Sequence, residues 1–219
     1  MCHTISEIIG DRGSVFRCRF KGMAVLMPCL IVMLMAPLLL LGCKGKADYK
    51  ETLIRISKKG TIESEIYESF DKPYYNKTEL ESVINEEIDD FNALNSNEER
   101  VKLKETVVED GSVSVTITYK SCSDYKEFNN VDFFVGTVNE ARAQGYPMTL
   151  TMKSTGGGPN ISEEDLNTMG ESKIIIISEP VLVETPSDIL YVTANIELVD
   201  ENHARMSSDS SGKAYIIIK

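Results

Sequence analysis

Residues 23 to 41 contain no charged side chain, and this apolar run divides the chain into a short leader and a long polar body. Most positions in the run are Leu, Met, Val, Ile, Ala or Pro. The leader before it is basic, with Arg12, Arg17, Arg19 and Lys21. A basic patch followed by an apolar run and a small residue is typical of a secretory signal. The pattern therefore predicts a signal peptide over residues 1–42, with its basic region to about residue 22 and its apolar region at 23–41.

The end of the apolar run, Leu40-Leu41-Gly42-Cys43, resembles the lipobox of bacterial lipoproteins. The resemblance implies that Leu40, Leu41 and Gly42 are recognised by a dedicated signal peptidase, which cuts before Cys43. It also implies that diacylglycerol is attached to the Cys43 thiol, with palmitate-type chains in the membrane. Two acyl chains give stable anchoring where one alone is marginal. Residues 43–47 then form the lipidated cysteine and a short tether, and the body faces outside the cytoplasm.

The same apolar run allows an alternative, because about 20 uncharged residues are long enough to span a bilayer without cleavage. Pro28 and Pro37 disfavour this alternative, since proline interrupts the hydrogen bonding of a helix. The choice between a cleaved signal and a single transmembrane helix stays open at the level of sequence.

The body, residues 48–219, is strongly acidic. The chain after Gly42 holds 19 basic and 32 acidic residues, a formal charge of −13. This excess of carboxylates argues against nucleic-acid binding, which depends on Lys and Arg at phosphates. A protein partner or a cationic partner is compatible with it. After cleavage only Cys43 and Cys122 remain, and lipid occupies the first, so we expect a body without disulfides that is held by its core.

Alternating apolar residues predict two β-hairpins in the first half of the body. One joins strands at 52–56 and 61–67, and the other joins 101–107 to 113–119 through an Asp-Gly turn. Between them, Thr78 and Glu81 have the spacing of a capping box, which predicts a helix over 78–94.

Two further capping boxes predict short helices, at Thr137 with Glu140 and at Ser162 with Asp165. We expect Gly145 to end the first of them. Apolar runs predict strands at 148–152, 174–177, 181–183, 189–198 and 215–218. The fold class predicted is α+β, a single domain with an antiparallel sheet built from hairpins and two or three helices. This order of elements is similar to uncharacterised lipoproteins of Gram-positive anaerobes, a resemblance that implies no activity.

The sequence of the body shows no motif for catalysis, for a cofactor or for a metal. Its one histidine, His203, is expected in an exposed turn, and with Cys122 it is too little for a zinc site or a thiol–imidazole pair. The glycines at 156–158 lack the ending of a phosphate-binding loop. We therefore expect a non-enzymatic binding or structural role in the cell envelope. The alternative is a surface hydrolase that uses two carboxylates across a cleft, which sequence cannot place.

Overall fold

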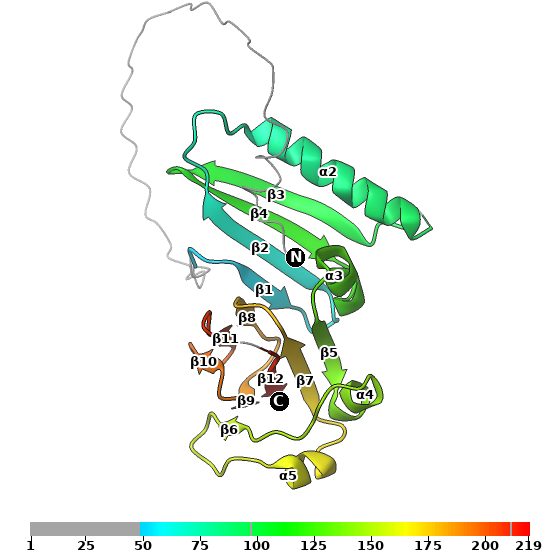
Figure 1. Ribbon diagram of the computed structural model, residues 1–219, viewed down its shortest axis with the longest axis vertical. Coiled ribbons are helices and arrows are strands. Elements are labelled where there is room, and N and C mark those ends of the chain that lie inside the picture. The colour runs from blue at the N-terminus through cyan, green and yellow to red at the C-terminus, as the bar shows by residue number, and fades with distance from the viewer. Residues whose placement is uncertain (1–48, 97, 211) are drawn as a thin grey trace, which may run out of the picture.

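A computed structural model describes residues 49–96, 98–210 and 212–219 (Figure 1). The predicted signal peptide, its recognition residues Leu40, Leu41 and Gly42, and the lipidation site Cys43 lie outside the described residues. Within the described part of the chain, no helix is long and apolar enough to cross a membrane.

The first half of the body builds most of a seven-stranded sheet with the order β10-β11-β8-β1-β2-β4-β3. Both predicted hairpins are confirmed, as β1 with β2 and as β3 with β4. However, β8 joins the sheet parallel to β1, so the expectation of a purely antiparallel sheet was wrong. The bounds of the strands are β1 Leu53–Ile56, β2 Ile62–Ser69, β3 Val101–Glu109, β4 Ser112–Tyr119, β8 Leu182–Glu184, β10 Ile196–Leu198 and β11 His203–Met206.

A second, five-stranded sheet has the order β5-β7-β12-β9-β6, where a single sheet had been expected. Its central strands are buried along nearly their whole length, because both faces of this sheet are covered. A strand buried on both sides reads as a continuous apolar run, and this explains the isoleucine-rich segments near the end of the chain. The strands are β5 Phe133–Thr137, β6 Lys153–Ser154, β7 Lys173–Ile177, β9 Ile189–Val192 and β12 Ala214–Ile218.

The described residues form four helices, one more than the upper expectation, and the fold is α+β. The first helix is capped differently from the prediction. Asn76 is its N-cap, because the Asn76 side chain accepts hydrogen bonds from the backbone N–H groups of Thr78 and Glu79 at 2.8 and 3.2 Å. Thr78 therefore lies inside the helix, and Glu81 instead pairs with Lys77. The helices are α2 Lys77–Leu94, α3 Cys122–Asn129, α4 Val138–Ala143 and α5 Glu163–Thr168.

The capping boxes of the two shortest helices are confirmed, at Thr137 with Glu140 and at Ser162 with Asp165. Gly145 ends α4 as expected. It adopts a left-handed conformation with φ of +82°, and its N–H donates to the Arg142 carbonyl. The next N–H, that of Tyr146, donates to Ala141. These two bonds form a Schellman motif, which satisfies carbonyls that the end of a helix leaves open.

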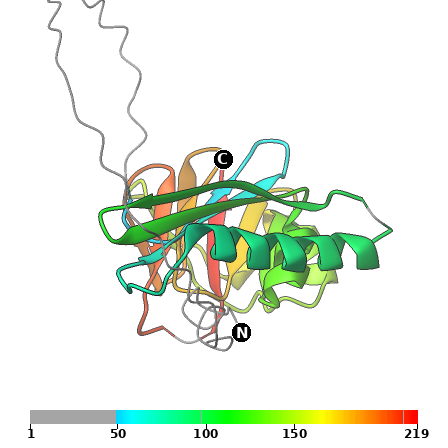
Figure 2. The ribbon, with the colours of Figure 1, turned by 90° about the horizontal axis from the view of Figure 1, so that it is seen from above.

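One face of the seven-stranded sheet carries the main core, and two different layers cover it. Helices α2 and α3 cover the hairpin strands, with Leu80, Ile84 and Ile88 of α2 buried (Figures 1 and 2). The five-stranded sheet covers the rest through apolar side chains of β7 and β12 such as Ile175 and Ile216. A second cluster fills the other side of the five-stranded sheet, beneath α4 and α5.

Two predicted strands differ from the structure. Residues 148–152 are irregular except for Met152, which forms an isolated bridge with Ile161. The segment 189–198 is not one strand but two, β9 and β10, which belong to different sheets. A turn at 193–195 separates them, where the Thr193 hydroxyl bonds the Asn195 side chain at 2.7 Å. The apolar pattern runs through this turn because the residues on both sides are buried.

Candidate functional site: a strand-end groove and an ion-paired sheet face

The other face of the seven-stranded sheet, which we call the outer face, carries many charged side chains beside the buried leucines Leu53 and Leu182. Alternation along the strands sends successive side chains to opposite faces of the sheet. On β1 and β2, for example, Ile54 and Ile62 are buried in the core, whereas Arg55, Glu63 and Glu65 point the other way. Register brings Arg55 opposite Glu63 on one neighbour and Glu184 on the other.

Arg55 is the centre of an ionic network on the outer face. Its guanidinium contacts Glu65 at 2.6 Å, Glu184 at 3.0 Å and Glu63 at 3.4 Å. The Arg55 side chain is only 15% exposed, so these contacts are partly shielded from water. Lys104 of β3 reaches across β4 to the second oxygen of Glu63. Arg55 of β1 therefore holds three carboxylates, two from β2 and one from β8.

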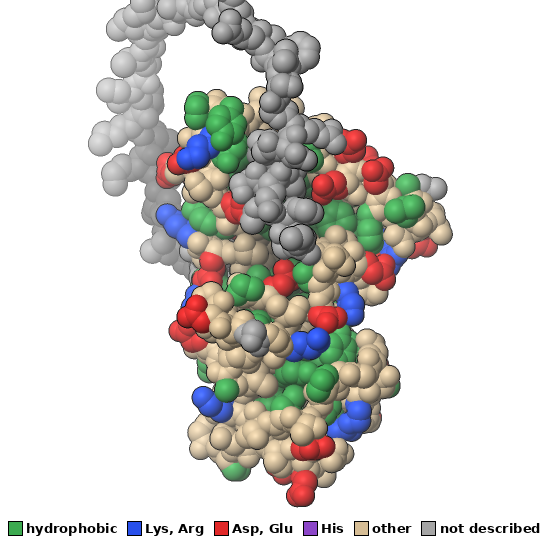
Figure 3. All heavy atoms as spheres, viewed as in Figure 1, with side chains coloured by type: hydrophobic (Ala, Val, Ile, Leu, Met, Phe, Trp, Pro, Cys, Tyr) green, Lys and Arg blue, Asp and Glu red, His purple; other side chains and the backbone are tan. Residues whose placement is uncertain are grey.

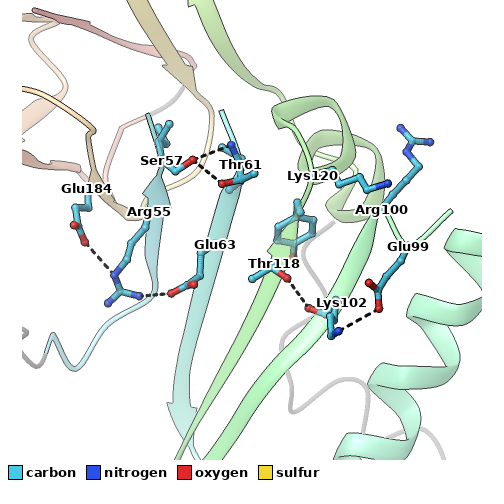
Figure 4. A pocket seen from close by; sticks show the side chains of 13 residues that line it. Arg55, Ser57, Thr61, Glu63, Glu99, Arg100, Lys102, Thr118, Lys120 and Glu184 are labelled. Atoms are coloured by element: carbon cyan, nitrogen blue, oxygen red, sulfur yellow. Dashed lines mark hydrogen bonds and ion pairs between the residues drawn. The ribbon is translucent and has the colours of Figure 1, made fainter. Parts of the chain in front are cut away.

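A groove of about 600 Å³ opens at one end of the strands, beside this network. We call it the strand-end groove. It is formed by the end of β1, the start of β2, the end of β4 and the start of β3, with Glu184 added from β8. Figure 4 shows Arg55 between Glu184 and Glu63 on one side of the groove, and Lys102 paired with Glu99 on the other. The volume suits a small molecule or a few residues of a peptide.

The charged groups of the groove have both signs and are already paired. Lys102 contacts Glu99 at 3.3 Å and Lys120 contacts Glu98 at 3.5 Å. Arg100 forms an ion pair with the buried carboxylate of Asp124 at the start of α3. Charged side chains of both signs are likewise interspersed on the face seen in Figure 3. A charged ligand in the groove can therefore replace one partner of an ion pair. The carboxylates of Glu63 and Glu184 both contact Arg55.

The start of the described chain is fastened to the same outer face by what we call the N-terminal clamp. Glu51 receives two hydrogen bonds from the Arg205 guanidinium, one of them from Nε at 2.8 Å. These hydrogen bonds lower the pKa of Glu51 although partial burial acts to raise it. The ring of Tyr49 lies against the imidazole of His203, with 5.1 Å between their centroids.

His203 is not in an exposed turn, as the sequence had suggested, but begins strand β11. Its side chain is 17% exposed. Its Nδ1 contacts both carboxylate oxygens of Asp200, at 2.8 and 2.9 Å. Burial acts to raise the pKa of Asp200, but hydrogen bonds from Asn202 and His203 lower it overall. The His203 imidazole therefore packs against Tyr49 of the clamp, and its Nδ1 is engaged with Asp200.

The other cysteine of the body has a separate environment. Cys122 starts α3, and its thiol lies 3.8 Å from the Val135 carbonyl. Cys122 and His203 are thus each engaged with other groups. Among residues 49–96, 98–210 and 212–219, no group of three or more His, Cys, Asp or Glu side chains is placed to hold a metal ion.

The residues that build the groove were not singled out from the sequence. The alternation in 62–67 does place Glu63 and Glu65 on one face of a strand, and this was the available signal. Arg55 and Glu184 are 129 residues apart, and only the parallel pairing of β1 with β8 brings them together.

No protein-family model matches the chain, and no curated protein or solved structure was found to match it.

Proposed function

We propose that this protein is a lipid-anchored protein of the bacterial cell envelope whose body binds a protein partner through the strand-end groove. Residues 1–42 direct export, and Leu40, Leu41 and Gly42 direct cleavage before the lipidated Cys43. The sequence Leu40-Leu41-Gly42-Cys43 at the end of an uncharged run carries the anchoring part of the proposal. The binding part rests on the ion-paired groove.

The N-terminal clamp supports this arrangement because it limits the distance between body and membrane. Tyr49 is fixed against His203, and only five residues separate it from Cys43. Six peptide steps span at most about 20 Å when fully extended. A lipid on Cys43 therefore keeps the clamp within that distance of the bilayer.

The groove begins at the end of β1, whereas Glu51 of the clamp lies just before the start of that strand. The chain leaves the clamp, runs along β1 from Leu53 to Ile56 and reaches the groove at its far end. The clamp and the groove adjoin at Glu184, which lines the groove and lies 3.7 Å from His203 Nε2 of the clamp. A partner can approach the groove while the lipid remains in the membrane.

The observation that carries binding rather than catalysis is that all three groove carboxylates are ion-paired: Arg55 holds Glu63 and Glu184, and Lys102 contacts Glu99. A hydrolase with two working carboxylates needs one free to act as acid and one as base or nucleophile. Ion pairs of both signs are instead suited to exchange with charged side chains of a partner, which gives specificity more than affinity. Because the chain after Gly42 carries a charge of −13, we propose a partner with a basic surface and no nucleic acid.

Palmitate labelling of cells that express the full chain tests the anchor. We expect label on the wild-type protein and on a Cys29→Ala control, which changes a cysteine within the apolar run. Cys43→Ala should abolish the label. Equal labelling of Cys43→Ala contradicts the proposal.

A photo-crosslinking residue in place of Thr118, in the groove, tests the binding site in intact cells. We expect one discrete protein adduct, which is lost when Arg55→Ala is added. The same crosslinker in place of Lys153, on β6 and away from the groove, should not give it. An adduct that persists in Arg55→Ala contradicts a role for the groove.

A further inference from the structure

A second, smaller pocket of about 200 Å³ lies where α3, the end of α4 and the starts of β5 and β12 meet. It is separate from the strand-end groove and shares no lining residue with it. Sheet register explains how it forms. Phe133 and Ala214 both pair with Ile177, so the residues before them, Asp132 and Lys213, lie on either side of the end of β7.

Two lysines share one carboxylate in this pocket. Lys126 Nζ and Lys213 Nζ each lie 2.9 Å from a different oxygen of Asp132. The hydrogen bond from Lys213, and next the one from Lys126, hold the pKa of Asp132 below its usual value. Each ammonium has three donors and directs one of them to Asp132, which leaves donors for another acceptor. Two ammonium groups and one carboxylate give the pocket a net positive charge in a chain of formal charge −11.

Tyr146 adds a buried hydroxyl that lacks an acceptor. The residue lines the pocket and is only 9% exposed; the Lys126 ammonium interacts with its hydroxyl oxygen as a donor, but no described residue accepts the hydroxyl's own proton. The ring is fixed on one side by the Schellman motif at the end of α4 and on another by Phe134, whose centroid lies 5.3 Å away. Because a buried hydroxyl whose proton has no acceptor destabilises a fold, its presence points to an acceptor supplied from outside the described residues.

We propose that this pocket binds a small phosphate group, either inorganic phosphate or a phosphate ester. Lys126 and Lys213 supply ammonium donors, and the Tyr146 hydroxyl donates to a further phosphate oxygen. Lysine binds phosphate as a point charge, and the residual charge of the pocket matches a monoanion. The carbonyls of Ala141 and Arg142 do not oppose an anion strongly, because both already accept hydrogen bonds. The anion reaches the shielded hydroxyl when the flexible Lys126 side chain, which is 44% exposed, moves aside.

Isothermal titration calorimetry of the detergent-extracted full chain tests the site, with inorganic phosphate, glycerol 3-phosphate and acetate as probes. We expect saturable binding of at least one phosphate probe and much weaker binding of acetate. Lys213→Gln and Tyr146→Phe should each weaken phosphate binding about tenfold. Lys153→Gln, an exposed lysine elsewhere on the same sheet, should leave it unchanged.

Thermal unfolding of Tyr146→Phe separates a binding role from a structural one. Removal of a buried hydroxyl that lacks an acceptor should change the melting temperature little while phosphate affinity falls. Tighter binding of glycerol 3-phosphate identifies the ligand as an ester, and tighter inorganic phosphate identifies the free ion. The proposal is overturned if neither phosphate probe binds, if acetate binds as well, or if Tyr146→Phe retains full affinity.

Discussion

Glu51 and Arg205 form a two-pronged ion pair between residues 154 positions apart, and this pair fastens the start of the body to strand β11. Both side chains are about one third exposed, at 33% and 34%. Glu51 follows Tyr49 by two residues, and the Tyr49 ring packs against His203. The N-terminal clamp therefore holds the first described residues against the sheet. The five residues between Tyr49 and Cys43 then limit how far the body can lie from the lipid.

Arg205→Gln should release the clamp with little loss of overall stability. Partly exposed ion pairs contribute about 1 kcal/mol or less, so the free energy of unfolding should change only slightly. Lys50 lies within the clamp and is exposed, so trypsin should cut after it severalfold faster. Arg142→Gln, which removes a partly exposed arginine of α4 that donates to Asn167, serves as the control. Equal cleavage rates in both variants, measured by mass spectrometry, contradict the clamp.

Acid should weaken the fold through Glu51 and Asp132. The pKa of each is lower in the folded state than in the unfolded chain, because Arg205 donates to Glu51 and Lys213 and Lys126 donate to Asp132. The stabilisation is complete above the ordinary carboxylate values and is lost as the pH falls through the lower folded values. Denaturant unfolding between pH 7 and pH 3 should show this loss. Glu51→Gln and Asp132→Asn should each reduce the slope, and an unchanged slope contradicts the assignment.

The N-cap of α2 gives a direct test of a corrected prediction. Asn76→Ala should lower the free energy of unfolding by about 1 kcal/mol, because two backbone N–H groups lose their acceptor. Thr78→Ala should have a much smaller effect, since Thr78 is not the cap. Chemical denaturation of both variants checks this. A larger loss in Thr78→Ala than in Asn76→Ala restores the capping box that the sequence suggested.

Because the two sheets share a core, we expect truncation of Ile175 to lower the free energy of unfolding strongly. This residue of β7 is fully buried in the core cluster that joins the sheets. Ile175→Ala should cost about 2–5 kcal/mol, the usual range when a buried aliphatic side chain is truncated. Val107→Ala is the control, because Val107 is 41% exposed on β3. Similar unfolding midpoints for the two variants contradict a shared core.

The local elements of this fold were largely readable from sequence because their signals are short in range. Alternation gave the hairpins, and the boxes at Thr137 and Ser162 gave two helix starts. The predictions from sequence were wrong where one local pattern is compatible with two structures. Asn76 and Thr78 are both good caps, and only the backbone geometry selects Asn76. The apolar run at 189–198 fits one long strand or two, and burial in both sheets hides the turn between them.

The groove could not be predicted because it depends on long-range pairing. Arg55 meets Glu63 through a hairpin, which sequence can suggest, but it meets Glu184 through a parallel pairing that closes a long loop. The prediction that His203 lies in an exposed turn was wrong for a related reason. Asp200 and Asn202 beside it favour a turn, and the pairing of β11 with β8 draws His203 into the sheet.

The measurement that tests the central claim most directly is the intact mass of the detergent-extracted protein, taken beside a Cys43→Ala variant. We predict a wild-type chain that begins at Cys43 and carries the mass of a diacylglyceryl group, and a variant without that mass. A wild-type mass that retains residues 23–41 contradicts the account. That segment is then an uncleaved membrane helix, and the clamp holds the body to a transmembrane stem instead of a lipid.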